Sequence, residues 1–153
     1  MANTIDAKLD FDFVEDLSRF EQNIKDKVLF TGVAAMAKSQ YDEVRLRCPV
    51  SEHAHFFYGR SSKKNGVRYY FEPGNLLASI YRAYSPEKSS ADVKTYRVSW
   101  NHRKAPYGFM VEFGTSNAPA HPFLRPAFDR INEAISIGKA AMAQRLATVG
   151  GDN

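Results

Sequence analysis

The chain has 153 residues, 44% of them hydrophobic, which suffices for one core of ordinary domain size. We expect a single domain over residues 1–153, ordered from about 10 to 148, with flexible ends at 1–9 and 149–153. The formal charge of +4 is far below the excess of a dedicated nucleic-acid-binding protein. A lone Cys48 excludes an internal disulfide and a Cys-pair zinc motif. Neither a signal peptide nor a membrane-spanning run is apparent, so we expect synthesis in the cytoplasm and no membrane partner.

The first predicted element is a helix from about Asp12 to Arg47, a stretch with no proline and one glycine, Gly32. Its early apolar residues recur at helical spacing, but beyond Gly32 the apolar set lies a quarter to a third of a turn further round. We therefore expect either a bend near Thr31-Gly32 or a helix whose halves pack against different partners, a neighbouring subunit being one candidate. Pro49 is expected to end the helix. The early set is Val14, Leu17, Phe20, Ile24 and Val28, and the later set is Val33, Met36, Ala37, Tyr41 and Val44.

Residues 53–72 predict a projecting β-hairpin, called the flap below. Two aromatic-rich stretches flank a polar cluster in which Asn65-Gly66 suits a turn with positive φ. Such aromatics and cations can stack bases and neutralise phosphate. The charges gather at the tip, however, which favours a packed flap with a solvated basic tip and leaves only non-specific contact with DNA open. The basic residues are Arg60, Lys63, Lys64 and Arg68, and the aromatic ones are Phe56, Phe57, Tyr58, Tyr69 and Tyr70.

The second half of the chain predicts short elements followed by a long helix. Residues 75–84 form a short helix capped by Asn75 and closed by Ser85-Pro86. Residues 92–100 alternate as a half-buried strand with Tyr96, Val98 and Trp100 on one face. Residues 107–113 suit a turn of helix or a short strand and lead into an extended loop.

A last helix is expected from Phe123 to Val149, with Pro126 in its first turn. Its stripe comprises Leu124, Ala127, Phe128, Ile131, Ala134, Ile135, Gly138, Met142 and Leu146. The order of elements does not alternate as β-α-β units do, so the predicted class is α+β. Long N-terminal and C-terminal helices would pack on a small, mostly antiparallel sheet, with the flap and a proline-containing loop.

For the residues that could act as metal ligands or nucleophiles, we favour a purely structural role. His53 and His55 share one face of a strand and could bind a metal, but no third ligand is near in sequence. Cys48 continues the apolar register of Val44 and is expected to be a small buried hydrophobe, not a nucleophile. Phosphate-binding glycine loops and a nucleophile elbow are absent from the sequence. We predict no enzyme activity, no cofactor and no metal.

At Tyr107 the sequence reaches the run YGFMVEFGTSNAPAHPFLRPAF. This run resembles the lambdoid-phage head-tail joining family, also called neck or tail-completion proteins, which shares Y-x-x-x-V-E-F-G-T-S, a spacer with prolines, and P-F-L-R-P-A-F. The matching positions are Tyr107, residues 111–116 and residues 122–128. A family segment G-x-L-x-x-S-I is also present as Gly74, Leu76, Ser79 and Ile80. The resemblance covers about residues 10–148, but the family passes from the proline to that segment within a few residues, whereas about two dozen intervene here.

The resemblance implies a structural virion protein at the head-tail junction, as a neck, tail-completion or tail-terminator subunit. It implies a homo-oligomeric ring, a hexamer or possible dodecamer, that contacts other neck and tail proteins, such as head-completion, tail-tube or terminator proteins, while DNA passes through the lumen. A ring needs different faces of one subunit to meet. The expected interface residues are Tyr107, Val111, Glu112, Phe113, Gly114, Thr115, Pro119, Pro122, Phe123, Arg125 and Pro126.

Within this segment we expect a mechanical role. Residues 118–122, stiffened by proline, would lose little entropy on docking. Phe113 and Phe123 would anchor the two ends of the loop, and Arg125 would pair with a carboxylate or carbonyl near the start of the helix. An equally weighted alternative is that the motif only connects a strand to a helix. Other functions left open are a small phage- or plasmid-encoded nuclease or toxin, and a monomeric binding module.

Overall fold

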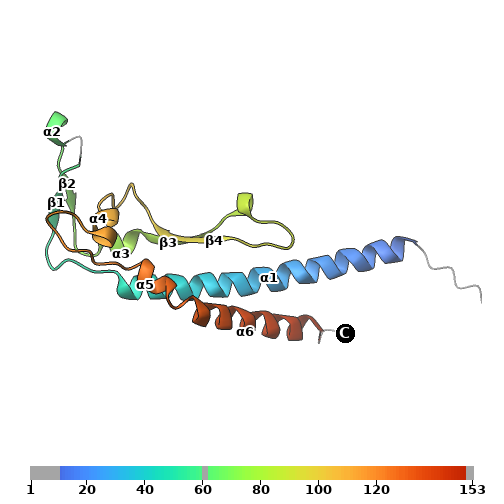
Figure 1. The fold of residues 1–153 in the computed structure, drawn as a ribbon. Coiled ribbons are helices and arrows are strands. Elements are labelled where there is room, and N and C mark those ends of the chain that lie inside the picture. The colour runs from blue at the N-terminus through green and yellow to red at the C-terminus, as the bar shows by residue number, and fades with distance from the viewer. Residues whose placement is uncertain (1–10, 60–61, 151–153) are drawn as a thin grey trace, which may run out of the picture.

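A computed structural model describes residues 11–59 and 62–150 of the chain. The predicted α+β class is confirmed: a long N-terminal helix and a C-terminal helix accompany two small antiparallel sheets (Figure 1). The expected flexible ends 1–9 and 151–153 lie outside the described residues, whereas residues 149 and 150 end the last helix. The elements are α1 Phe11–Arg47, β1 His55–Phe57, α2 Ser62–Asn65, β2 Tyr69–Phe71, α3 Asn75–Ser79, β3 Ile80–Tyr84, a 3-10 turn Pro86–Lys88, β4 Tyr96–Trp100, α4 Gly108–Phe113, α5 Arg125–Phe128 and α6 Ile131–Gly150.

Helix α1 is the longest element of the described structure, and it continues without interruption past Gly32. Its fully buried residues all belong to the second half, where Ala37, Gln40 and Val44 face the interior. The first half carries exposed apolar side chains instead, among them Phe20 and Phe30. Of the two explanations for the shifted apolar stripe, the structure therefore contains the helix whose halves have different surroundings. Figure 1 shows the first part of α1 extending beyond α6 and the β3-β4 hairpin.

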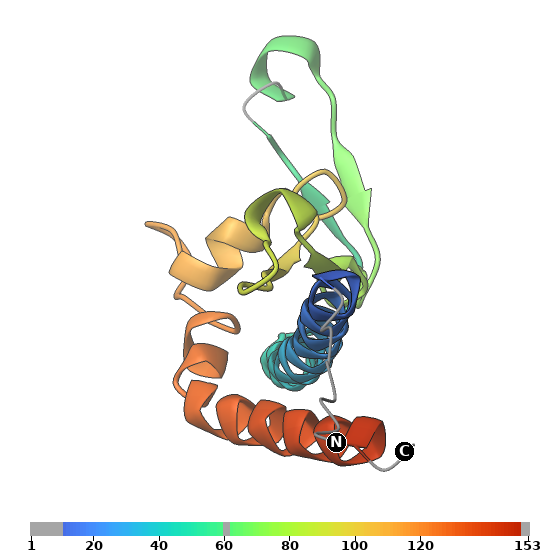
Figure 2. The same cartoon turned by 90° about the vertical axis from the view of Figure 1, so that its right-hand side faces the viewer.

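The two long helices pack closely because glycine occupies each side of the contact. A Cβ added to Gly32 would come within 2.2 Å of Met142, and one added to Gly138 within 2.3 Å of Met36. The predicted bend position is thus a site of close helix approach. Figure 2 shows α1 nearly end-on, with α6 on one side and the sheets with α4 on the other.

The segment predicted as a helix over residues 75–84 is helical only to Ser79. From Ile80 to Tyr84 it is strand β3, which pairs with β4 so that Ile80 lies opposite Trp100. The aromatic and β-branched side chains in this stretch favour a pleated surface once a partner strand is available. Asn75 also differs from the expectation: Gly74 occupies the cap position, and the Asn75 amide donates to the Lys104 carbonyl at 2.9 Å.

The predicted hairpin of the flap is confirmed. Strands β1 and β2 pair in antiparallel register, with His55 opposite Phe71 and Phe57 opposite Tyr69. The short helix α2 lies between them, and Gly66 has the expected positive φ of 66°. This hairpin is separate from the β3-β4 pair, which is the small antiparallel sheet that we expected beside the flap.

The last predicted helix is divided in two. Helix α5 contains Pro126 in its first turn, as expected, and α6 starts at Ile131. Arg130 lies at the break, where its guanidinium contacts Glu133 at 2.6 Å and Glu43 of α1 at 3.4 Å. Ala127 and Ala134 of the predicted stripe are fully buried, whereas Phe128 and Leu146 are more than half exposed. Among the described residues, no helix has both the length and the apolar character of a membrane span.

Candidate interaction site

Residues 107–128, called the signature segment below, fold into α4, a returning loop and α5. Gly114 ends α4 with a φ of 76°, and a Cβ there would lie 2.8 Å from the backbone nitrogen of Ala120. The loop is closed by a bridge in which the Thr115 N–H donates to the Ala118 carbonyl at 2.9 Å. The His121 N–H donates to the Val111 carbonyl at 2.8 Å. The proline-containing loop is therefore held against α4 by its own backbone.

Glu112 organises the segment from within. Its side chain is 1% exposed and accepts hydrogen bonds from the backbone N–H groups of Phe123, Leu124 and Arg125 at 2.8, 3.0 and 3.1 Å. These N–H groups lie at the start of helix α5, where they have no acceptor within the helix, so the carboxylate acts as its N-terminal cap. Burial by itself raises the pKa of Glu112, but these backbone bonds and the Arg125 side chain lower it by more, so the pKa lies below its ordinary value.

Arg125 adds the cationic half of this arrangement. Its Nε donates to the Glu112 carboxylate at 3.1 Å and its terminal nitrogen to the Glu112 carbonyl at 2.7 Å. The predicted pairing of Arg125 is confirmed. The guanidinium carbon also lies 4.6 Å from the centre of the Phe113 ring, which in turn contacts Phe109 at 4.7 Å. An exposed patch of two aromatics and one arginine results.

The two expected loop anchors differ in their surroundings. Phe123 is fully buried and meets Trp100 edge-on at 5.7 Å between ring centres. Phe113 is half exposed, so it is not an anchor inside the subunit. The sequence did not predict that Trp100 packs against Phe123. Trp100 donates to the Ala105 carbonyl at 3.1 Å, and a Cβ on Gly108 would lie 2.4 Å from its indole nitrogen.

Tyr107 joins the signature segment to the base of the flap. Its ring contacts His55 at 5.0 Å, Phe71 at 4.9 Å and Phe57 at 6.2 Å. Its hydroxyl accepts a hydrogen bond from the Asn75 amide at 3.2 Å. Burial raises the pKa of this phenol, and the Asn75 bond opposes that rise. The phenol therefore acts as a buried packing group.

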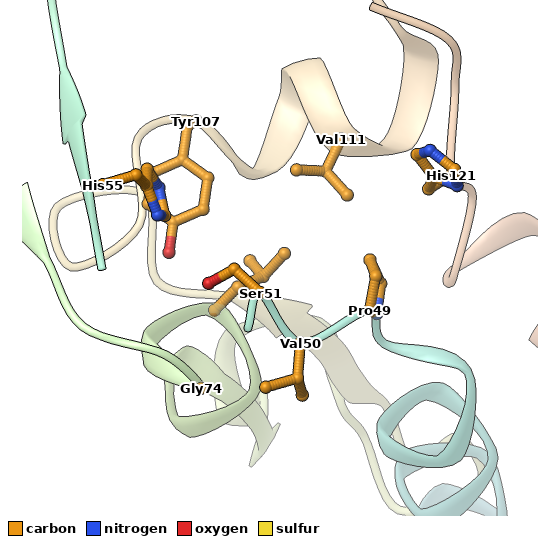
Figure 3. A pocket seen from close by; sticks show the side chains of 9 residues that line it. Pro49, Val50, Ser51, His55, Gly74, Tyr107, Val111 and His121 are labelled. Atoms are coloured by element: carbon orange, nitrogen blue, oxygen red, sulfur yellow. The ribbon is translucent and has the colours of Figure 1, made fainter. Parts of the chain in front are cut away.

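A pocket of about 230 Å³ opens beside Tyr107. Figure 3 shows Tyr107 and Val111 of the signature segment on one side, His55 and His121 at opposite edges, and the chain after Pro49 below them. The described residues that line it include no Asp or Glu. The mainly apolar lining suits a side chain of a partner protein.

The predicted interface residues separate into inward and outward groups. Tyr107, Glu112 and Phe123 are buried within the subunit and support the segment. Val111, Gly114 and Pro126 are half-buried. The outward residues, which a partner could contact directly, are Phe113, Thr115, Pro119, Pro122 and Arg125. Whether they form an interface stays a prediction.

The other candidate chemistry finds little geometric support. Within residues 11–59 and 62–150, no three His, Cys, Asp or Glu residues come together as metal ligands would. Cys48 is 7% exposed in the core, as expected, and burial raises the pKa of its thiol to about 11. At neutral pH this thiol is protonated and poorly nucleophilic.

Comparisons with models of protein families, with curated proteins and with solved structures find no match to this chain.

Proposed function

We propose that this chain is a structural virion protein of a tailed bacteriophage, a ring-forming subunit of the head-tail connector. Its neighbours would be further copies of itself and the neck and tail proteins on either side, with DNA passing through the lumen. The resemblance of the signature segment to the head-tail joining family supports this assignment. The main argument for it is the large solvent-accessible area of the chain.

The chain exposes far more surface than a compact monomer. Its accessible area is 11528 Å², whereas a compact protein of 17.3 kDa exposes about 7800 Å². Deducting the most that the fifteen residues outside the described ranges could expose, about 2400 Å², leaves about 9100 Å². This is about 1900 Å² more than the roughly 7200 Å² of a compact protein with the mass of the remaining 138 residues. Permanent complexes bury about 2000 to 5000 Å² at an interface. The excess is of the size that association covers.

The exposed apolar residues lie on several sides of the molecule. They include Phe20 on α1, Phe56 and Tyr70 on the flap, Phe113 at the end of α4, and Phe128 on α5. A two-fold dimer would use one patch twice, whereas a ring joins two different patches of each subunit. This distribution favours a ring over a dimer or a monomeric binding module.

The test is light scattering of the purified chain combined with electron microscopy, alone and mixed with isolated tails. We expect rings with six-fold or twelve-fold symmetry and attachment to one end of the tail tube. A chain that stays monomeric at high concentration and does not bind to tails would contradict the proposal. So would cleavage of DNA by the monomer, with or without a divalent metal, which would favour a nuclease.

A further inference from the structure

The flap has two unlike faces. Its inner face, which includes His55, Phe57 and Phe71, contacts Tyr107. Its outer face carries Phe56 and Tyr70, opposite each other with ring centres 5.3 Å apart and each more than half exposed. A two-stranded hairpin is marginally stable in water and gains from a covering partner.

The outer face continues toward the tip with Tyr58, which is 59% exposed. The Arg68 guanidinium lies 5.5 Å from the centre of its ring. These two contacts, Phe56 with Tyr70 and Tyr58 with Arg68, are together called the aromatic ridge of the flap below. Figure 1 and Figure 2 show that the flap projects from the rest of the subunit.

An apolar groove lies at the opposite end of the molecule. This groove of about 390 Å³ lies between α1, the end of α6 and the loop of the β3-β4 hairpin, and its apolar lining includes Ile24, Val28, Leu29, Met142 and Leu146. One helical turn before Ile24, Phe20 is 57% exposed. The groove and Phe20 together present apolar side chains on the first half of α1 and at the end of α6. Figure 1 shows that the first half of α1 and the end of α6 lie far from the flap.

The two ends carry opposite charge. In the sequence, residues 55–71 contain four cations and no Asp or Glu, giving a net charge of +4, and of these cations Lys64 and Arg68 are described with their side chains. Residues 11–25 of α1 contain the four carboxylates Asp12, Glu15, Asp16 and Glu21 against the two cations Arg19 and Lys25, giving −2. Complementary charge of this kind guides association and fixes which surfaces meet.

We propose that the outer face of the flap of one subunit docks in the α1-α6 groove of a second copy of this chain, with the basic tip beside the acidic first half of α1. Within one molecule the two surfaces lie at opposite ends, so the contact joins copies head to tail. This inference rests on the proposed function, because it specifies which surfaces join neighbouring subunits. The aromatic ridge fills the groove, and the charges set the orientation.

Chemical cross-linking tests the contact between copies. Tyr58→Cys and Phe20→Cys are placed in separate chains, which are mixed and treated with a short bismaleimide. We expect a covalent dimer of the two variants. The matched control replaces Phe20→Cys with Leu46→Cys, which is 78% exposed at the other end of the same helix and is expected to give none. Native Cys48 is buried and does not compete. Assembled rings without the Tyr58–Phe20 product would overturn the docking and leave the ring itself standing.

Charge reversal supplies an independent test. Lys64→Glu with Arg68→Glu, or Glu15→Lys with Glu21→Lys, is expected to lower the average mass by light scattering, and combining both pairs to restore it. Circular dichroism checks that each variant is folded. An unchanged mass with the reversed flap overturns the proposal. If that variant instead loses only its retention of DNA, the flap belongs to nucleic-acid contact. A wild-type chain that never associates defeats the proposed function as well.

Discussion

Glu112 holds a charge where water does not reach, and its environment determines how the chain responds to acid. The pKa of this carboxyl is below its ordinary value of 4.5 in the folded chain, so folding favours the ionised form. Its stabilising effect is complete above that ordinary value and is lost as the pH falls through the lowered pKa. At the residue scale, Glu112 should therefore contribute to acid sensitivity, as should Glu43, whose pKa is also lowered, chiefly by its hydrogen bond with Arg47.

We predict that Glu112→Ala lowers the free energy of unfolding by about 3 kcal/mol, because three backbone donors, one buried and two part-buried, lose their acceptor. Glu112→Gln should cost less, since an amide oxygen remains, and should reduce the loss of stability below the ordinary carboxyl pKa. Denaturant unfolding across pH measures both. The control Glu133→Gln, whose side chain is 60% exposed, should change stability by less than about 0.5 kcal/mol. A Glu112→Gln variant with the wild-type pH profile would contradict this assignment.

At the scale of elements, the contact between α1 and α6 depends on two glycines facing each other's helix. A Cβ at position 138 would lie 2.3 Å from the Met36 side chain and 3.0 Å from the Gly32 carbonyl oxygen. Alanine is the better helix former by about 1 kcal/mol, so helix propensity alone would make the substitution stabilising. The close approach opposes that gain.

We expect Gly138→Ala to destabilise the chain by about 1 to 3 kcal/mol through overpacking. The same substitution in a Met36→Ala background should cost less, because the two nearest contacts, both with the Met36 side chain, are then removed. A thermodynamic cycle of the two substitutions, measured by chemical denaturation, gives the coupling between them. Equal or higher stability of the single variant would contradict the packing described here.

The sequence pattern predicted those helices and turns that are determined by residues within the element itself. Proline-free length and apolar spacing identify α1, and Asn65-Gly66 identifies the flap turn, because both signals lie within the element itself. The strand after Ser79 was predicted as a helix, since its partner β4 is remote in sequence. The break before Ile131 was missed for a similar reason: Arg130 bonds to Glu43, eighty-seven residues away.

The candidate site was predicted only in part. Its residues were identified from the motif, and the need of Arg125 for an acceptor was foreseen. The inward direction of Glu112 was not, because a carboxylate between apolar neighbours has the same pattern whether it faces solvent or caps a returning loop. Trp100 was assigned to the correct face of its strand, but the contact with Gly108 is a tertiary one.

At the scale of the whole molecule, the large exposed area links stability to association. A subunit that buries apolar surface only against its neighbours is stabilised by mass action as its concentration rises. We therefore predict that Tm increases with protein concentration, as measured by calorimetry over a dilution series. In about 1 M salt, where charges are screened beyond about 3 Å, the increase should be smaller if opposite charges guide assembly. A Tm independent of concentration would contradict assembly in this range.

Cys48 has a consequence for durability. With one thiol, enclosed in the core and protonated at neutral pH, the subunit offers no accessible cysteine to oxidants in its surroundings. In the proposed head-tail connector, this thiol would stay reduced both in the bacterial cytoplasm and after release into air-saturated water.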